Sequence, residues 1–404
     1  MSPDLFESDC PGALVPTSAI EEYSEAGAKR TREAAGWAFV PHRLAPDVDI
    51  TALCGRVSEA LVAAHSSLGE IRGLSGDLPL TRLFVAPLLQ REALLSSRIE
   101  NTIATAREVA EYRAGRTPTR NDPIEVDNYR RALLHGVESD LPICRRLVRE
   151  MHRILCHGVR GAAQHPGEFR TSQNRIGGER DDFSSARFVP PPAGDYLDGC
   201  LDALERFWNT PPKGLDPMLA VAMAHYQFEA VHPFEDGNGR LGRALVPLSL
   251  CRLGLLNEPL VYVSGYFERH RRDYYDLLLR VSTHGEWASW CRFFLFAIAD
   301  VGRDSAARLR CVRDLRHNVL NRLAESNAPG RVSQLVDALI DQPLMSVTAV
   351  KEHLSVTYPT AKNYIDRLAD VGFLHELTGG QYGRLWGATA VLDVVQNDMP
   401  ESAG

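Results

Sequence analysis

The most informative stretch of the chain reads His232-Pro233-Phe234-Glu235-Asp236-Gly237-Asn238-Gly239-Arg240-Leu241-Gly242-Arg243. The glycines and the asparagine at its centre allow positive backbone φ angles and a close approach of the main chain to a ligand. The segment from Arg240 to Leu250 is a good helix former, so its first N–H groups point back into this turn. A helix N-terminus behind a glycine-rich turn attracts anions. The sequence therefore predicts a phosphate-binding turn.

The charged side chains of this stretch are the parts of a phosphoryl- or nucleotidyl-transfer site. Arg240 and Arg243 share one helix face, where two guanidinium groups can grip phosphate oxygens. Asp236 is a hard oxygen ligand suited to the Mg²⁺ that accompanies nucleotide phosphates. His232 has a side chain that can accept a proton from an attacking hydroxyl near neutral pH. A solvated turn with a helix cap is the plainer alternative, and the coincidence of so many specified residue types argues against it.

This stretch resembles the signature of the Fic family, H-P-F-x-[DN]-G-N-G-R-x-x-R, at every specified position. The resemblance implies a protein adenylyltransferase, an enzyme that moves AMP from ATP to a Ser, Thr or Tyr hydroxyl and releases pyrophosphate. It makes His232 the general base, Phe234 the anchor of the loop in the core, and Asp236 the holder of Mg²⁺.

The resemblance also implies a division of labour among the phosphate-binding groups. The implied nucleotide-binding residues are Gly237, Asn238 and Gly239 for the anion nest, Arg240 for the β-phosphate side and Arg243 for the γ-phosphate. Doc-type relatives, which transfer the terminal phosphate, carry a lysine at the place of Gly239. The glycine here therefore favours transfer of AMP.

Two further segments resemble the flap of the family, which pairs with the target segment by strand addition. They are Gly167–Thr171 and Phe188-Val189-Pro190-Pro191. The flap would bring the acceptor hydroxyl near His232, and an ordinary exposed loop is the alternative. The aromatic residues around Tyr266 and Tyr274 resemble the stretch that lines the family's nucleotide pocket, although a simple core explains them equally well.

A second motif lies upstream of the Fic signature. Ser96, Glu100 and Asn101 match the family's inhibitory motif, [ST]-x-x-x-E-[GN]. The resemblance implies that Glu100 pairs with Arg243, occupies the γ-phosphate position and keeps ATP out of its productive pose. In some relatives the same glutamate positions a water that removes AMP from a modified protein, so deAMPylation stays open beside inhibition.

Hydrophobic spacing indicates a mainly α protein with small β additions. The predicted organisation is an irregular N-terminal arm (1–30), a helical region with the inhibitory helix (31–125), a Fic helical core with a β-hairpin flap (126–300), a helical connector (301–328) and a winged helix-turn-helix domain (329–396). The last assignment depends on three helices followed by a hairpin around Thr378-Gly379-Gly380.

Charge argues against DNA as the partner of the C-terminal domain. Residues 331–404 contain five basic and nine acidic residues. The expected recognition helix offers only Lys362 and Arg367, opposed by Asp366 and Asp370. Because phosphate contacts dominate DNA affinity, dimerisation or target recruitment is the favoured role, with DNA binding open but not favoured.

Composition excludes other classes. The net charge of −7 argues against a nonspecific nucleic-acid binder, and no apolar run approaches the ~18 residues of a membrane span. The eight cysteines form no C-x-x-C pair, so no zinc ribbon is expected. The start of the chain lacks the features of a secretory signal, which predicts a cytoplasmic protein without membrane contact.

The expected partners are ATP and a target protein, or the chain itself, with Mg²⁺ as cofactor and a homodimer open. One alternative function is a DNA-binding regulator whose Fic core modifies itself. Another is a Fic transferase with a different donor, such as UTP or a phosphocholine carrier, because the motif reads phosphates and not bases.

Overall fold

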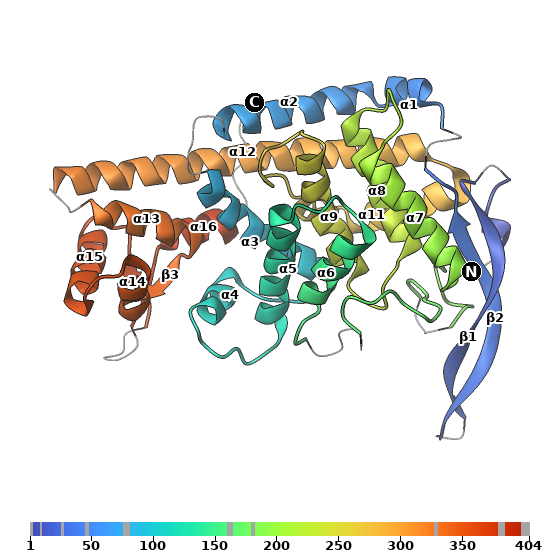
Figure 1. Cartoon of the computed structure of the whole chain (residues 1–404), viewed down its shortest axis with the longest axis horizontal. Helices are drawn as coiled ribbons and strands as arrows, with labels where there is room; N and C mark the ends of the chain where they lie inside the picture. The colour runs from blue at the N-terminus through green and yellow to red at the C-terminus, as the bar shows by residue number, and fades with distance from the viewer. Residues whose placement is uncertain are drawn as a thin grey trace.

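The computed structural model describes residues 3–8, 10–25, 28–44, 48–75, 81–159, 165–178, 182–326, 330–378 and 384–396. The chain is mainly helical, as predicted. Figure 1 shows an elongated molecule with a β-hairpin at one end and the C-terminal elements at the other. None of the helices in the described part of the chain is long and apolar enough to cross a membrane.

The core is built around α8 (Pro217–Val231), whose sequence PMLAVAMAHYQFEAV is apolar on nearly every side and buried accordingly. The helix starts sharply because Asp216 caps it through the N–H of Met218 and Pro217 occupies its first turn. It packs against α7 (Asp195–Asn209), α9 (Asn238–Arg252) and α11 (Arg271–His284). Helices α5 (Asp122–Glu138) and α6 (Arg145–Leu155) pack on each other and on α9.

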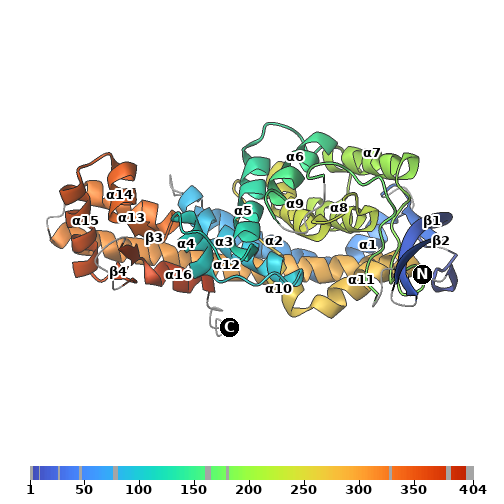
Figure 2. The same cartoon turned by 90° about the horizontal axis from the view of Figure 1, so that it is seen from below.

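A long helix, α12 (Trp287–Glu325), runs along the molecule and connects its two ends (Figures 1 and 2). It packs against α2 (Ser58–Ser75), which follows the short α1 (Ile50–Arg56), and against α8. The segment predicted as a helical connector (301–328) is thus helical up to Glu325 and continues a helix that begins in the core. The helix continues because Val301, Leu309, Val312, Val319 and Leu323 stay buried along one side.

The helix that carries the upstream motif is α3 (Thr81–Ile99). It packs against α5, α9 and α12 and against the short α10 (Ser264–Arg269). Its next neighbour in sequence is α4 (Ala106–Arg113), which begins with a reciprocal capping box between Thr105 and Glu108. The motif thus lies at the C-terminal end of a helix that the core holds on several sides.

The N-terminal segment differs from the prediction. Instead of an irregular arm over 1–30, the chain forms an antiparallel hairpin of β1 (Gly12–Glu25) and β2 (Ala28–Pro41). Its root packs on the loop before α7 through a small cluster in which Ala38, Phe183 and Val189 are buried. The stabilising partners are therefore about 150 residues away in sequence, which explains why local pattern did not reveal the hairpin.

The C-terminal elements are α13 (Arg331–Asp341), β3 (Leu344–Ser346), α14 (Val347–Leu354), α15 (Tyr358–Asp370), β4 (His375–Glu376), β5 (Leu385–Gly387) and α16 (Thr389–Gln396). The strands form one antiparallel sheet in the order β3-β5-β4. The hairpin expected at Thr378-Gly379-Gly380 connects β4 to β5, and residues 379–383 lie outside the described part of the chain. Both α13 and α16 pack on α3.

Candidate functional site

The turn between α8 and α9 is shaped by two residues in the left-handed region. His232 follows α8 with φ 48° and ψ 63°, and Gly237 precedes α9 with φ 78°. The side chain of Asn238 closes the turn, because its Oδ1 accepts from the Phe234 N–H at 2.9 Å and its Nδ2 donates to the Phe234 carbonyl at 2.8 Å. Asn238 thus contributes only its backbone N–H to the open side of the turn.

Phe234 fixes this turn to the core. Its ring is fully buried and stacks on the imidazole of His152, with ring centroids 3.7 Å apart and planes inclined by 7°. His152 in turn accepts from the Gly167 N–H through Nδ1 and contacts the Asp236 carbonyl through Nε2 at 2.9 Å. Burial lowers the pKa of His152 to about 4, so it is a neutral structural group at pH 7.

The first N–H groups of α9 face the open side of the turn, since the first turn of a helix has no intrahelical acceptors for them. Arg240 and Arg243 flank them, and each guanidinium is held by a carboxylate from another part of the chain. Arg240 contacts Glu125 of α5 at 3.0 Å and Asp236 at 3.3 Å. Helix α9 thus places its first N–H groups between two arginines, an arrangement that can bind an anion.

Arg243 contacts two residues of the upstream motif. Its side chain is 1% exposed. Its Nε donates to the Ser96 hydroxyl at 2.9 Å, and its Nη2 donates to the Ser96 carbonyl at 3.0 Å and to Glu100 Oε1 at 2.9 Å. The Glu100–Arg243 contact that the resemblance implied is therefore present in the fold.

Asn101 ends the helix segment that carries Glu100. Its φ is 63°, a left-handed conformation that asparagine and glycine adopt more readily than other residues. The Glu100 N–H still donates to the Ser97 carbonyl, and the Asn101 N–H to that of Arg98. The backbone requirement at this position thus accounts for the choice between glycine and asparagine in the motif.

Gly239 lies against the Glu100 carboxylate. A Cβ atom at Gly239 would come within 2.5 Å of Glu100 Oε1 and 2.9 Å of Arg243 Nη1. A side chain here would displace Glu100 from Arg243. The glycine therefore lets the ion pair lie directly against the start of α9.

Burial and charge set the protonation states around Arg243. Burial alone would raise the pKa of Glu100, but the Arg243 guanidinium outweighs it and the pKa is lowered. Glu229 lies on the same side and is aimed into the cavity, and its Oε1 is buried without a hydrogen-bond partner. Burial raises the pKa of Glu229 to about 7, against the opposing effect of Arg243. Glu100 is therefore ionised at neutral pH, whereas burial favours the protonated form of Glu229.

His232 is a partly buried imidazole whose Nδ1 contacts the Glu229 carbonyl at 3.3 Å. Because a carbonyl only accepts, the proton of the neutral ring sits on Nδ1 and Nε2 carries the free lone pair. Burial and the charge of Arg170 lower the pKa of His232 to about 4. At neutral pH the ring is therefore unprotonated and can take up a proton.

Asp236 has the features of a Mg²⁺ ligand in a nucleotide site. Its side chain is half exposed. Its Oδ1 accepts from the Gly237 N–H at 2.6 Å, while Oδ2 faces Arg240. Across the described ranges, no group of three or more His, Cys, Asp or Glu side chains converges on one point. A single carboxylate nevertheless fits Mg²⁺, because this ion is commonly bound by one or two carboxylates together with substrate phosphates and water.

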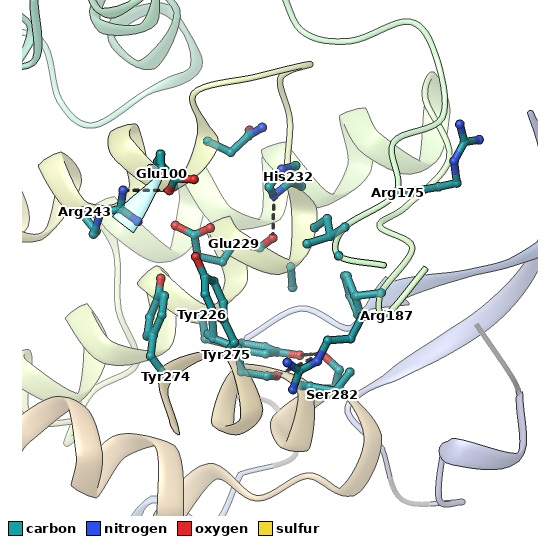
Figure 3. A pocket seen from close by; sticks show the side chains of 18 of the residues that line it. Glu100, Arg175, Arg187, Tyr226, Glu229, His232, Arg243, Tyr274, Tyr275 and Ser282 are labelled. Carbon is teal, nitrogen blue, oxygen red and sulfur yellow. Dashed lines mark hydrogen bonds and ion pairs between the residues drawn. The ribbon is translucent and has the colours of Figure 1, made fainter. Parts of the chain in front are cut away.

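One cavity of about 470 Å³ is lined by Glu100, Glu229, His232, Arg243 and residues 236–239 of the turn. Figure 3 shows Glu100, Arg243, Glu229 and His232 at one end of it, and Arg187 and Ser282 at the other. The walls between them are Ile176 and Phe188 on one side and Leu278 and Leu279 of α11 on the other. The cavity therefore joins a charged end, suited to phosphates, to a middle part with apolar walls, suited to a flat ring.

The two predicted flap segments lie together beside this cavity. The first is tied to the Fic turn, because the Arg170 N–H donates to the Pro233 carbonyl at 2.9 Å. Phe188 forms a single antiparallel bridge with Ile176. Val189 is buried and its carbonyl accepts from the Phe39 N–H of β2 at 2.9 Å, so the hairpin extends the edge of this loop. Pro190 is buried beside it.

Several residues of the site were not predicted from the sequence. Glu229 precedes the Fic motif, and Glu125 lies on α5, so neither falls inside a motif whose spacing could single it out. Arg170 lies within the predicted flap but was not given a role of its own. Tyr274 and Tyr275 do line the cavity. The Tyr274 hydroxyl also forms a hydrogen bond with Nε2 of the buried His225 at 3.0 Å. A buried partner far away in sequence leaves no local signal.

Two adjoining parts of the chain match models of one family. Residues 58–138 match the Fic/DOC family N-terminal model, and residues 142–250 match the Fic/DOC family model. The chain belongs to the Fic/DOC family. The Fic signature and the cavity above both lie within or beside the matched residues.

Curated relatives are similar to parts of this Fic chain. The "Protein adenylyltransferase Fic" of Aedes aegypti is 38% identical over 128 residues, which are 31% of this chain and 22% of that protein. Its namesake in Drosophila yakuba is 26% identical over 243 residues, or 58% of this chain and 43% of that protein. The Fic chain therefore spans less than half the length of these relatives.

A solved structure shares the fold. The crystal structure of a Fic family protein from Desulfovibrio desulfuricans G20 has a TM-score of 0.51, is 20% identical, and covers 86% of this Fic chain and 97% of its own. At this identity the likeness concerns the fold alone.

Proposed function

We propose that this Fic protein transfers AMP from ATP to a Ser, Thr or Tyr hydroxyl of a target protein. The observation that carries the proposal is the position of a neutral His232 beside a helix N-terminus with two buried arginines, in a cavity with room for a nucleotide. The names of the partial relatives, which are called protein adenylyltransferases, support the same reaction.

In the proposed reaction the acceptor oxygen attacks the α-phosphorus of ATP. The bond between this phosphorus and the bridging oxygen breaks, and pyrophosphate leaves. His232 takes the hydroxyl proton on Nε2. The α9 N-terminus, Arg240 and Arg243 stabilise the negative charge on the phosphates. Mg²⁺ held by Asp236 would neutralise further charge on the leaving group.

We also propose that Glu100 inhibits this reaction. Its carboxylate holds Arg243 in an ion pair, which keeps this guanidinium from a γ-phosphate. Ser96 supports the pair by accepting from the same guanidinium at two points. ATP must therefore displace Glu100 before Arg243 can bind its phosphate.

The test is mass spectrometry of the intact Glu100→Gly protein after incubation with ATP and Mg²⁺. We expect an added AMP on a hydroxyl residue of the chain, absent in a Glu100→Gly/His232→Ala control and weak in wild type. If no AMP adduct forms with ATP but an adduct forms with UTP or CDP-choline, the proposed AMP transfer is wrong and the protein catalyses another Fic reaction. No adduct from any of these donors would contradict self-modification and restrict the proposal to an external target.

For the C-terminal region we propose a winged helix-turn-helix that serves target recruitment or dimerisation. On α15, Lys362 is paired with Asp366 of the same helix at 2.8 Å, and Arg367 donates to Asn363. These contacts leave little positive charge for phosphates. A gel-shift titration of the full chain with its own promoter DNA tests this role, since tight and salt-sensitive binding would overturn it.

A further inference from the structure

Arg170 is a buried guanidinium that binds backbone carbonyls from two separate segments. The residue is 3% exposed. Its Nε donates to the His232 carbonyl at 2.8 Å, and its Nη2 contacts the Val231 carbonyl at 3.4 Å. On the other side, Nη2 donates to the Pro191 carbonyl at 2.5 Å and Nη1 to the Ser172 carbonyl at 3.0 Å.

Burial of this charge has a cost that the fold must offset. A buried ion is normally paired with an opposite charge, because desolvation of a lone ion is unfavourable. Among the described residues, the contacts of the Arg170 side chain are carbonyl oxygens and none is a carboxylate. Burial accordingly lowers the pKa of Arg170 to about 10, which still leaves it charged at pH 7. Simple packing would not require an arginine in such a place.

The carbonyls that Arg170 contacts belong to two parts of the site that must keep a fixed separation. Val231 and His232 form the end of α8 and the start of the Fic turn. The backbone N–H of Arg170 also donates to the carbonyl of Pro233 in this turn. Pro191 and Ser172 lie at the base of the flap. One side chain therefore joins the flap to the backbone of His232.

The backbone of His232 needs such support. A non-glycine residue in the left-handed region costs on the order of 1 kcal/mol and persists only where its surroundings fix it. The His232 N–H is fixed by the Phe228 carbonyl, and its own carbonyl by Arg170. Without Arg170, the peptide after His232 loses the donor that sets its orientation.

We propose that Arg170 is a positioning residue that holds the flap and His232 in register, so that a hydroxyl placed by the flap faces Nε2 of His232. The inference rests on the proposed AMP transfer. It assigns Arg170 no contact with ATP, because its donors are directed at backbone carbonyls and Arg170 does not line the cavity.

The charge of Arg170 has a second effect on the same histidine. The charged groups that act on His232 are Arg170 from the flap, Glu100 from α3 and Asp236 from the turn itself. After burial, Arg170 is the strongest influence that lowers the pKa of His232. Arg170 thus favours the unprotonated ring in addition to orienting it.

The test compares Arg170→Gln and Arg170→Lys with Arg149→Lys, all in the Glu100→Gly protein. Arg149 is a matched control, because its Nε donates to only one carbonyl of the same loop, that of Gly167, at 2.7 Å. Self-modification with ATP and Mg²⁺ is measured against ATP concentration. We expect the maximal rate of Arg170→Gln to fall about 100-fold, as for a misplaced catalytic group, with the half-saturating ATP concentration unchanged. The maximal rate of Arg170→Lys should lie between those of Arg170→Gln and the parent protein, since lysine keeps the positive charge but cannot donate to several carbonyls at once as a guanidinium does.

Hydrogen exchange supplies a readout that does not depend on the reaction. Amides in residues 172–178 and 186–189 should exchange faster in Arg170→Gln than in Arg149→Lys, while those of α8 stay protected. Unchanged exchange in the flap would overturn the inference even if no AMP adduct forms in any variant. An active Glu100→Gly protein whose rate is unaffected by Arg170→Gln would overturn it as well. If Arg170→Gln fails to fold in a thermal melt, the same two measurements on Arg170→Lys decide.

Discussion

Replacement of Glu100 by glycine is the perturbation that most directly tests the inhibitory contact. Glu100 follows the last residue of α3, so a glycine here does not interrupt the helix. The substitution removes the carboxylate that Arg243 Nη2 contacts at 2.9 Å and leaves Ser96 as the remaining partner of the guanidinium. ATP then no longer has to break an ion pair before it reaches Arg243.

The size of the effect follows from the unequal burial of the pair. The Arg243 side chain is 1% exposed and that of Glu100 is 38% exposed. A fully buried pair loses about 3–5 kcal/mol when one partner is removed, whereas an exposed pair contributes about 0–1 kcal/mol. A half-shielded pair should therefore contribute about 2 kcal/mol, which corresponds to a rise in ATP affinity of about 30-fold.

The assay is calorimetric titration with a non-hydrolysable ATP analogue and Mg²⁺ at pH 7. Because the pKa of Glu100 is lowered, the carboxylate is ionised at this pH and its loss is a full change of charge. Glu111→Gln is the control, since Glu111 pairs with Arg107 at the surface of α4 and lies away from the cavity. Equal affinities for wild type and Glu100→Gly would refute the inhibitory reasoning.

The ligand-free protein provides a second sign of the same contact. Glu100→Gly leaves a buried cation with only a hydroxyl and a carbonyl, so it should melt at a lower temperature than wild type without ATP. Addition of the ATP analogue should raise the melting temperature of the variant by more than that of wild type. A variant that melts as wild type does, with and without ligand, would show that the ion pair has no energetic role.

Three further outcomes are expected. The rate of self-modification should be flat from pH 6 to 8 and fall in acid, because the pKa of His232 is about 4; a midpoint near pH 6.5 would show that the ring is not shielded. Glu229→Gln should stabilise the protein at pH 8 by about 3 kcal/mol and leave its stability unchanged at pH 4. Burial raises the pKa of Glu229 from 4.5 to about 7, so the folded wild-type protein loses stability as the pH rises through this window. An equal effect of the substitution on the melting temperature at both pH values would contradict this. The buried Glu21 carboxylate accepts a hydrogen bond from the Phe183 N–H at 2.8 Å. Glu21→Gln should weaken this contact between the hairpin and the loop and speed proteolysis near residue 183. Unchanged cleavage would show that Glu21 does not anchor the hairpin.

Much of the site could be predicted because its parts are consecutive in sequence. The Fic turn needs glycine at a left-handed position, an asparagine that bonds back to Phe234 and arginines one turn into α9, and all of these lie in one stretch. The limits of α8 are also marked in the sequence, because an apolar segment lies between Asp216 and His232. Local chemistry was sufficient in both places.

The rest depends on partners far away in sequence. Glu125 contacts Arg240 from α5, and nothing in its neighbourhood marks it out. The hairpin strands contain Pro16 and several alanines and glutamates, which disfavour strands. Their stability therefore depends on their pairing with each other and on packing against distant residues such as Phe183 and Phe188. Arg170 was visible within the flap, but its carbonyl partners become apparent only when the turn and the flap are folded together.

The way α3 is held determines how the inhibitory contact can open. Glu92, one turn before Ser96, is buried and accepts from the Tyr129 hydroxyl of α5 at 2.8 Å and from the Ser264 N–H at the start of α10 at 3.2 Å. A shift of the whole helix would break both bonds and leave a buried carboxyl unsatisfied, which costs about 1–3 kcal/mol for each lost partner. The helix also packs on α13 and α16 of the C-terminal region. Glu100 is past the helix end and partly exposed, so rotation of its side chain is the less costly movement. The structure therefore favours release by a local swing of Glu100, with the rest of α3 remaining in place.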